Sequence, residues 1–287
     1  MKSKVLSLLA AFGLFIGVLA CAARPVVTAV SVNFDEIPVP IFLYHHVTEK
    51  SSYWGRDSIS PAELESDLQM LTEYGYTTVS LAQVIDYVRG KGNLPPKAVV
   101  LTFDDGFLNY RDVVVPLLEK YNCRATLAIV GEYADNAENR VTDNPNFEYM
   151  TWEEAASLDP CVTELAYHSY SSHQTNDPAT GRRGMKKRAG ESNEEYGTYL
   201  MNEWEAFSHK AEEYGISCRV TAYPFGSYSD TSDALLSSLG IEATLTCESG
   251  VNHIRRGEGE VLFGLKRTNR PHGVDSEAFF KKYLTMG

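Results

Sequence analysis

The sequence predicts an α/β fold, a deformed (β/α)7-type barrel in a single domain, and three observations lead to this prediction. Short apolar runs that suit strands alternate with helical patterns from about residue 40 to the C-terminus. This alternation favours parallel strands joined by crossover helices, and about seven such units suit a barrel better than an open sheet. Roughly 265 residues follow the N-terminal segment, a usual size for one α/β barrel.

The predicted strands and helices follow one another without an internal repeat. The strands are expected at Ile41–Tyr44, Ala98–Phe103, Ala125–Val130, Glu164–Tyr167, Val220–Tyr223, Ile241–Thr246 and Val261–Leu265. The helices are expected after Ser60, from Ser80 to about Gly90, at Tyr110–Tyr121, after Thr151, and at Glu194–Tyr214, Ser229–Leu239 and Ser276–Leu284.

Local capping signals mark where several of these helices begin. Ser60–Glu63 is a capping box with proline at the first helical position, and leucines follow it at helical spacing. Ser80–Gln83 opens the next helix, and Thr151–Glu154 caps a later one. Each cap therefore separates a strand from the helix that follows it.

The N-terminus predicts export from the cytoplasm. Lys2 and Lys4 precede an uncharged apolar run, and Val18–Cys21 resembles a bacterial lipoprotein signal in which Cys21 carries the lipid. We therefore expect a signal peptide over residues 1–21, a tether over 22–36 and the folded domain over 37–287. Cleavage without lipidation and an uncleaved anchor are the alternatives, and each places the domain outside the cytoplasm.

Composition narrows the set of partners. The chain has 38 acidic and 26 basic residues, a net charge of −12, which disfavours nucleic acid and anionic membrane surfaces. No later segment has the ~20 apolar residues of a membrane span, so membrane contact is expected only through a lipid anchor. The later cysteines lack the paired spacing of a zinc module, and the sequence does not pair them as disulfides; they are Cys123, Cys161, Cys218 and Cys247.

Two adjacent carboxylates follow one of the predicted strands. In a βα barrel the reactive groups lie at the C-terminal ends of strands, and Asp104 and Asp105 end the run Ala98–Phe103. Neighbouring buried carboxylates repel each other unless a cation or a proton intervenes. A metal ion would relieve this repulsion, because one carboxylate binds the ion while the other stays available as a base. Gly106 permits the sharp turn that this arrangement needs.

Imidazoles and a turn end other predicted strands. His168 and His173 follow Glu164–Tyr167 five residues apart, a spacing that a turn can bring to one ion. With Asp105 they would complete a His-His-Asp set that leaves positions for water and substrate. His45 and His46 follow the first strand, and Pro224-Phe225-Gly226 follows Val220–Tyr223.

Four segments together resemble a known family. The strings LTFDDG, HSYSSH, AYPFG and LYHHV resemble those of the NodB-type polysaccharide deacetylases, carbohydrate esterase family 4; they occupy residues 101–106, 168–173, 222–226 and 43–47. The chain is most similar to the branch of poly-N-acetylglucosamine deacetylases, over about residues 39–270. The resemblance implies a NodB-type barrel and the removal of acetyl groups from an N-acetylated polysaccharide.

The resemblance also implies roles for individual residues. Asp104 would be the base and His45 the general acid, with His46 or His272 as alternatives for the acid. Asp105, His168 and His173 would bind the metal, most readily Zn²⁺, with Co²⁺ or Ni²⁺ as alternatives. The turn would supply the oxyanion contact and substrate contacts through Phe225, Pro224 and Tyr223.

One position departs from the common family pattern. Ala222 stands where most members have an arginine that holds the catalytic aspartate, although the poly-N-acetylglucosamine branch also has alanine there. Arg267 and Arg270 are candidates for this task, and the alternative is that both are solvated charges at the rim. The departure keeps a second hypothesis open, a catalytically silent glycan-binding module that retains the metal site.

Other enzyme classes fit less well. Glycosidase carboxylates lie about 5–10 Å apart across the scissile bond, which adjacent aspartates do not easily straddle, and no GxSxG elbow of a serine esterase is present. The sequence leaves the glycan open among peptidoglycan, poly-N-acetylglucosamine, chitin-like oligomers and O-acetylated xylan. A basic run would either contact an anionic polymer or form a solvated loop; its members are Arg182, Arg183, Lys186, Lys187 and Arg188.

Overall fold

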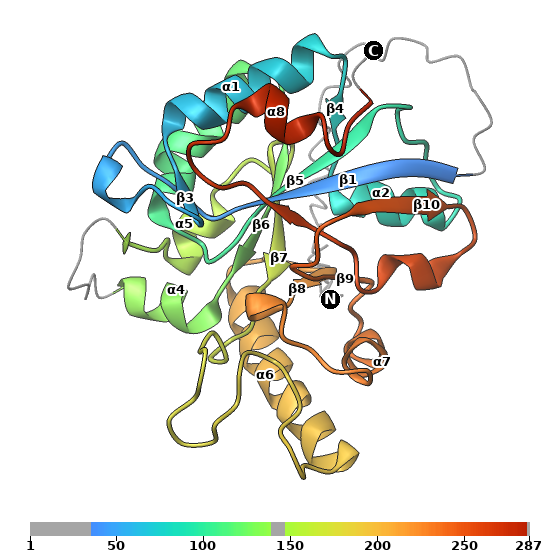
Figure 1. Cartoon of the computed structure of the whole chain (residues 1–287). Coiled ribbons are helices and arrows are strands. Elements are labelled where there is room, and N and C mark those ends of the chain that lie inside the picture. Colours follow the sequence, from blue (N-terminus) through green and yellow to red (C-terminus); the bar gives the residue numbers. More distant parts are fainter. Residues whose placement is uncertain (1–35, 139–146, 286–287) are drawn as a thin grey trace, which may run out of the picture. The chain divides into compact units, whose positions relative to one another are not determined.

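A curled, mostly parallel sheet forms the centre of the molecule (Figure 1). The computed structural model describes residues 36–138 and 147–285, so the expected signal peptide and nearly all of the expected tether lie outside the described residues. The strands are β1 (Glu36–Tyr44), β2 (His46–Val47), β3 (Ser58–Ile59), β4 (Thr77–Thr78), β5 (Ala98–Phe103), β6 (Ala125–Ile129), β7 (Thr163–Tyr167), β8 (Val220–Ala222), β9 (Ala243–Leu245), β10 (Val251–Arg255) and β11 (Thr268–Asn269).

The order of the strands confirms the predicted α/β barrel class. The main order is β10-β1-β5-β6-β7-β8-β9, in which every neighbouring pair is parallel except β10 with β1. β4 adds to β5 and β11 adds to β1, both in parallel. Parallel neighbours place the C-terminal ends of β1, β5, β7 and β8 at one edge, where the predicted site residues follow.

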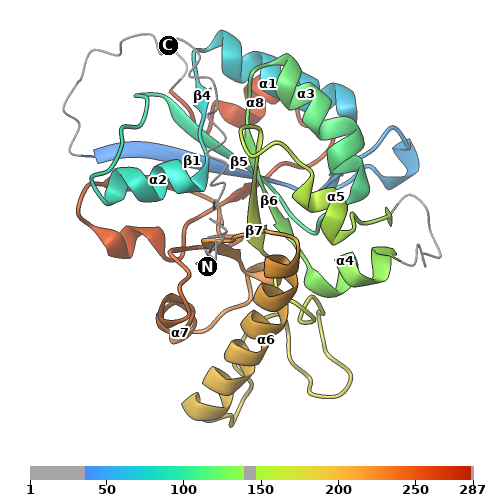
Figure 2. The ribbon, with the colours of Figure 1, turned by 180° about the vertical axis from the view of Figure 1, so that it is seen from behind.

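Most of the helices pack against one face of this sheet, and one packs against the other (Figures 1 and 2). They are α1 (Pro61–Glu73), α2 (Leu81–Val88), α3 (Val115–Lys120), α4 (Gly131–Glu138), α5 (Trp152–Ala156), α6 (Asn193–Glu213), α7 (Ser232–Ser238) and α8 (Ser276–Phe280). The capping boxes predicted at Ser60, Ser80 and Thr151 are all formed, with both reciprocal hydrogen bonds present. A single π-helical turn, Tyr110–Val114, precedes α3 within the helix predicted there.

Alternate residues of β5 show how the two faces are filled. Val99, Leu101 and Phe103 pack in the cluster that contains α1, α3 and α8. Ala98 and Val100 point into the opposite cluster, which contains α2. The backbone N–H groups at the start of α2 donate to the half-buried Glu164 carboxylate of β7, 2.8 Å each from Leu81 and Ala82. α2 is therefore fixed to the sheet at its N-terminus.

The segment 265–269 joins the two ends of the curled sheet. Leu265 forms a parallel bridge with Leu245 of β9, and Thr268 pairs with Phe42 of β1. The strand predicted at Val261–Leu265 is wrong: a 3₁₀ turn occupies Gly259–Leu262, and only Leu265 pairs with the sheet. Gly264 has φ of +74°, a left-handed conformation that ends the apolar run before it can extend.

Two further observations bear on the class of protein. No helix within residues 36–138 and 147–285 is long and apolar enough to span a membrane. Cys123, Cys218 and Cys247 carry free thiols.

Candidate active site

Asp104 and Asp105 diverge at the end of β5. Asp104 is 2% exposed, and its backbone N–H donates to the Tyr44 carbonyl at 3.0 Å, which continues the pairing of β5 with β1. Asp105 has φ of +76° and Gly106 has +79°, so the chain turns sharply after Asp104. A side chain at Gly106 would approach Ile129 to 3.2 Å, which explains glycine there. The strained turn separates the two carboxylates that the sequence places side by side.

Arg267 holds Asp104 with two parallel hydrogen bonds. Its Nη1 and Nη2 donate to the two carboxylate oxygens at 2.7 and 2.8 Å, and its Nε donates to the Thr246 carbonyl at 2.8 Å. Burial by itself would raise the pKa of the Asp104 carboxyl, but the Arg267 guanidinium and then His168 outweigh it, so this pKa lies below its ordinary value. Asp104 is therefore kept ionised in a fixed orientation.

The second arginine nominated from the sequence has another partner. Arg270 donates to both oxygens of Asp67 in α1, at 2.9 and 3.1 Å. Both arginines are at most 1% exposed, so the alternative that they are solvated rim charges is wrong. Asp67 also accepts a hydrogen bond from the Tyr44 hydroxyl, so this pair ties α1 to the end of β1.

Asp105, His168 and His173 come together as one cluster. One ligand atom from each lies within 4.8 Å of the other two. His168 Nε2 is 3.5 Å and His173 Nε2 is 3.1 Å from Asp105 Oδ1, and His168 Nε2 is 3.7 Å from Asp104 Oδ2. The five-residue spacing of the histidines therefore does bring both rings to one carboxylate.

The other ring nitrogens of both histidines already have partners. His168 Nδ1 lies 2.7 Å from the Ala222 carbonyl, which can only accept, so Nδ1 carries the proton. His173 Nδ1 lies 3.1 Å from the Tyr133 hydroxyl, which is also 3.4 Å from the His173 carbonyl. Burial raises the pKa of Tyr133 to about 12, so this hydroxyl keeps its proton and can donate to that carbonyl.

This arrangement fits a divalent metal ion. With Nδ1 protonated, both Nε2 atoms are acceptors, and they face a carboxylate oxygen that is also an acceptor. Three acceptors this close are favourable only around a cation or a proton, and two imidazoles with one carboxylate are a common zinc donor set. The partners on Nδ1 orient the rings as metal-ligating histidines usually require.

Glu203 of α6 shapes the loop that carries His173. Its carboxylate accepts from the backbone N–H groups of Tyr170 and Ser171 at 3.0 and 3.1 Å, and from the Ser171 hydroxyl at 2.6 Å. Ser169, with φ of +80°, supplies the reversal of the chain just after His168. The sequence alone does not point to Glu203 or Tyr133, because a glutamate in a long helix and a tyrosine in an unpredicted helix carry no local signal.

The turn after β8 lies against His173. Phe225 has φ of +58°, and its ring centroid is 4.5 Å from that of His173. The two hydrogen bonds of the turn come from the backbone N–H groups of Gly226 and Ser227. Tyr223 is fully buried, and its hydroxyl donates to Asp233 at 2.7 Å, so this side chain supports the turn from below. Pro224 is also buried.

The three histidines nominated as acids have different surroundings. His46 is 2% exposed, bonded through Nδ1 to Ser58 at 3.1 Å and packed against aromatic rings. His272 Nδ1 lies 2.8 Å from Glu63 at the start of α1. His45 is close enough to Asp104 and Asp105 to help lower the pKa of both carboxyls, and its buried Nδ1 has no hydrogen-bond partner among the described residues.

Fold and site together define a class of hydrolase: an α/β barrel whose strand ends hold an arginine-bound carboxylate beside a His-His-Asp cluster. Residues 91–244, more than half of the chain, match the family model "Polysaccharide deacetylase". The chain belongs to this family.

Individual relatives agree with this assignment. The chain is 29% identical over 230 residues to poly-beta-1,6-N-acetyl-D-glucosamine N-deacetylase of Escherichia coli K12, covering 72% of this chain but only 34% of that relative. The enzyme of that name from Staphylococcus epidermidis is 24% identical over 67% of this chain and 62% of its own length.

Solved structures support the fold. A de-N-acetylase from Aggregatibacter actinomycetemcomitans has a TM-score of 0.68 and 25% identity over 86% of this chain and all of that one. The Streptococcus pyogenes deacetylase PplD, solved with acetate, has a TM-score of 0.69 and 17% identity, covering 87% and 99%. At such identity the latter supports the fold alone.

Proposed function

We propose that the chain is a metal-dependent N-deacetylase that removes acetyl groups from an N-acetylglucosamine-containing polysaccharide at the cell surface. The observation that carries this proposal is the pairing of Asp104 with Arg267 directly beside Asp105, His168 and His173. The two relatives named as poly-N-acetylglucosamine deacetylases favour that glycan over the other candidates. The pairing also weakens the case for a silent glycan-binding module, since Arg267, from the segment 265–269, takes the place of the missing arginine.

Each residue has a task in such a reaction. The ion held by Asp105, His168 and His173 would act as a Lewis acid toward the acetyl carbonyl and increase the acidity of water in the site. Asp104 accepts the proton from the attacking water at a carboxylate oxygen, and Arg267 keeps that carboxylate ionised. The Phe225 backbone N–H donates to the oxyanion. His45 donates a proton to the amine nitrogen, because an amine leaves readily only when protonated.

Acetate release tests the proposed function. We expect the purified chain to release acetate from N-acetylglucosamine oligomers and much less from O-acetylated xylan, as followed by an enzymatic acetate assay. Among neutral N-acetylglucosamine oligomers, a β-1,6-linked one is expected to be the best substrate. Glycan binding without acetate release from any member of the panel, in protein with a full complement of metal, would favour the silent module instead.

Metal removal is expected to abolish activity. The fit of the cluster to zinc predicts that dialysis against a chelator removes both the metal and acetate release, and that Zn²⁺ or Co²⁺ restores them. Tyr133→Phe should weaken zinc affinity by about 10–100-fold, because loss of a partner to a ligating histidine typically costs that much. Competition with a chromogenic chelator measures the affinity directly. Unchanged affinity in Tyr133→Phe would contradict the proposed orientation of His173.

The variant His45→Ala tests whether His45 is the general acid. General acid assistance is worth about 10²–10⁴-fold, so we expect a loss of that size with an N-acetyl glycan. An aryl acetate has a leaving group that needs little protonation, so its hydrolysis should fall far less. Comparing kcat for the two substrates at equal zinc content measures the difference. Equal losses on both would remove His45 from this role and direct attention to His46 or His272.

The location of the protein is a further part of this proposal. We propose that residues 1–21 are a lipoprotein signal, that 22–36 are a tether and that Cys21 is lipidated, which would keep the domain at the outer face of the membrane. The basic start, apolar run and Cys21 support this arrangement. The mass of the mature N-terminal peptide tests it: a diacylglyceryl adduct on Cys21 is expected, and an unmodified N-terminus downstream would contradict it.

A further inference from the structure

The insertion between β7 and α6 forms a basic cavity of about 600 Å³ that is open to solvent. Its charged lining consists of Arg182, Arg183, Lys186, Lys187 and Arg188 against two glutamates, Glu191 and Glu195. Five positive and two negative charges leave a local excess of three positive charges. The chain as a whole has a net charge of −12, so this excess is a local departure from an acidic background.

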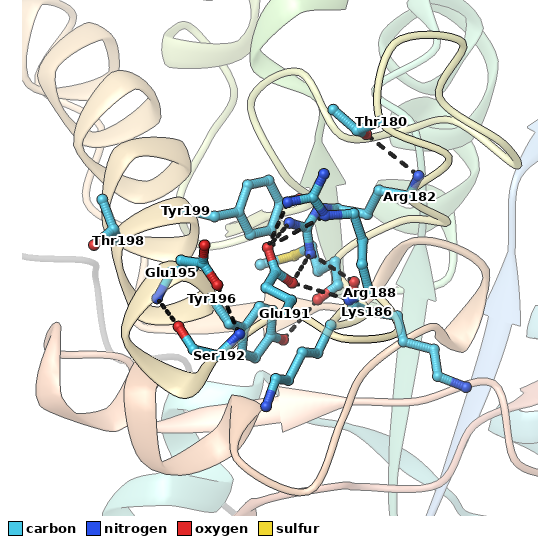
Figure 3. A network of polar contacts seen from close by, with 12 residues as sticks. Thr180, Arg182, Lys186, Arg188, Glu191, Ser192, Glu195, Tyr196, Thr198 and Tyr199 are labelled. Atoms are coloured by element: carbon cyan, nitrogen blue, oxygen red, sulfur yellow. Dashed lines mark hydrogen bonds and ion pairs between the residues drawn. The ribbon is translucent and has the colours of Figure 1, made fainter.

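A buried ion pair gives the insertion a fixed shape. Arg182, 6% exposed, donates to both oxygens of Glu191 at 3.1 and 2.5 Å, and its guanidinium lies 3.6 Å from the centroid of the Tyr199 ring. Figure 3 shows Arg182, Tyr199 and Glu191 meeting at the centre of this network. Arg188 also contacts Glu191, through its backbone N–H at 2.9 Å. These residues therefore build the cavity wall.

Three other cations of the cavity are left without a carboxylate partner. Arg183 and Lys186 are exposed and form no ion pair in the part of the chain that the structure describes. The Lys187 ammonium donates to the neutral Asn193 amide oxygen at 2.6 Å. Glu195, the other acidic group of the wall, accepts the backbone N–H of Ser192 at 2.8 Å in the capping box of α6. An anion entering the cavity would thus meet positive charge already in place.

Arg183 connects this cavity to the candidate active site. Its guanidinium lies 5.1 Å from the centroid of the Phe225 ring, and this ring also lies 4.5 Å, centroid to centroid, from the His173 ring. Its Nε donates to the Ser227 hydroxyl at 3.0 Å. The next residue, Gly184, is so close to the turn that a side chain there would come within 2.7 Å of the Pro224 carbonyl oxygen. The insertion is therefore packed against the proposed oxyanion turn.

We propose that this cavity is a subsite for an anionic group, a carboxylate or a phosphate, carried by the glycan that is deacetylated. This inference rests on the proposed function and narrows its substrate class to N-acetylated glycans with an acidic group near the acetylated sugar. The planar fork of Arg183 suits the two oxygens of a carboxylate or phosphate, and Lys186 adds a mobile point charge. The buried Arg182–Glu191 pair, with the hydrogen bond from Arg182 to the Lys186 carbonyl, holds the backbone that carries these charges.

The selectivity of deacetylation tests the subsite. We would compare kcat/KM for three oligomers of equal length: neutral N-acetylglucosamine, N-acetylglucosamine alternating with a uronic acid, and a phosphorylated N-acetylglucosamine oligomer. The wild type should prefer at least one acidic oligomer, and 0.5 M NaCl should erode the preference through screening. In Arg183→Gln/Lys186→Gln the ratio of acidic to neutral kcat/KM should fall about tenfold, the expected effect of two partly exposed ion pairs.

A matched control removes the same total charge elsewhere. Lys91→Gln/Lys282→Gln changes two exposed lysines outside the cavity, so it should keep the wild-type ratio if the effect is local. Lys186→Gln alone changes an exposed side chain without an ion pair, so it should fold normally and shift the ratio in the same direction. Comparing kcat/KM for the uronic acid oligomer with kcat/KM for the phosphorylated oligomer shows which anion is preferred.

Direct binding separates this inference from the proposed function. Calorimetry with uronate and phosphorylated hexosamine oligomers that carry no acetyl group should show binding that Arg183→Gln/Lys186→Gln weakens about tenfold and the control does not. Such binding supports the subsite even if no glycan releases acetate. The absence of acetate release would contradict only the proposed function. Equal kcat/KM for neutral and acidic oligomers, together with no loss of binding in the double variant, would overturn the subsite.

Discussion

Asp104→Asn is expected to lower kcat for an N-acetyl glycan by at least about 10²–10⁴-fold, because asparagine cannot accept the proton from water. The metal content should stay close to that of the wild type, since the proposed ligands Asp105, His168 and His173 are unchanged. The substitution also leaves the buried Arg267 without its counter-charge, so the free energy of unfolding should fall by about 3–5 kcal/mol. Steady-state kinetics, metal analysis and denaturant unfolding measure the three effects.

Asp67→Asn is the matched control for this loss of stability. It breaks an equally buried pair, with Arg270, on the α1 side of the sheet, so a similar loss of stability is expected. Asp67 has no task in the proposed reaction, so kcat should stay within a few-fold of the wild type below the melting temperature. If Asp67→Asn lost as much activity as Asp104→Asn, the loss at Asp104 would reflect stability and not a missing base.

Arg267→Gln is expected to have the second largest effect. Removing the guanidinium leaves Asp104 buried and unpaired, which should again cost about 3–5 kcal/mol of stability. In the wild type, Arg267 helps hold the pKa of Asp104 below its ordinary value, and the base works only when ionised. Without Arg267 the pKa of Asp104 should rise. As the pH is lowered, the variant should therefore lose activity at a higher pH than the wild type does.

The pH profile of activity distinguishes an effect on the base Asp104 from a general loss of stability. The acid limb of kcat/KM should move to higher pH in Arg267→Gln and stay in place in Arg270→Gln, although both variants lose a buried ion pair. Arg267→Lys should fall between the wild type and Arg267→Gln, because lysine restores the charge but not the two parallel hydrogen bonds. An acid limb that does not move in Arg267→Gln would contradict the assignment of Asp104 as the base.

Elements with a strong local signal were predictable from the sequence. The apolar run of β5, the capping boxes of α1, α2 and α5 and the alternation of strands with helices each depend on nearest neighbours, and the structure bears them out. Asp105, His168 and His173 were also expected at one site and do lie together, because residues that follow the parallel strands β5 and β7 meet at the same edge of the sheet.

Features that depend on distant residues were not predictable. β10 was missed because its inward residues are Asn252 and Ile254, so no clean apolar alternation marks it. The partner of Asp104 stayed open between two arginines, since only the packing of the segment 265–269 decides between them. Tyr133 and Glu203 act through hydrogen bonds to residues 30 or more positions away, for which the sequence holds no pattern.

The closing segment 265–269 also sets the order in which the site can be completed. Asp104 and Arg267 are 163 positions apart in the chain, so their contact closes one of the longest loops of the domain. Contacts of such separation form slowly and late, because the entropy of closing the loop must be overcome first. A chain made from its N-terminus onward would hold the proposed metal-binding residues well before Arg267 appears. The base is therefore expected to become competent only after the C-terminal part has docked, which delays hydrolysis until synthesis of the chain is nearly finished.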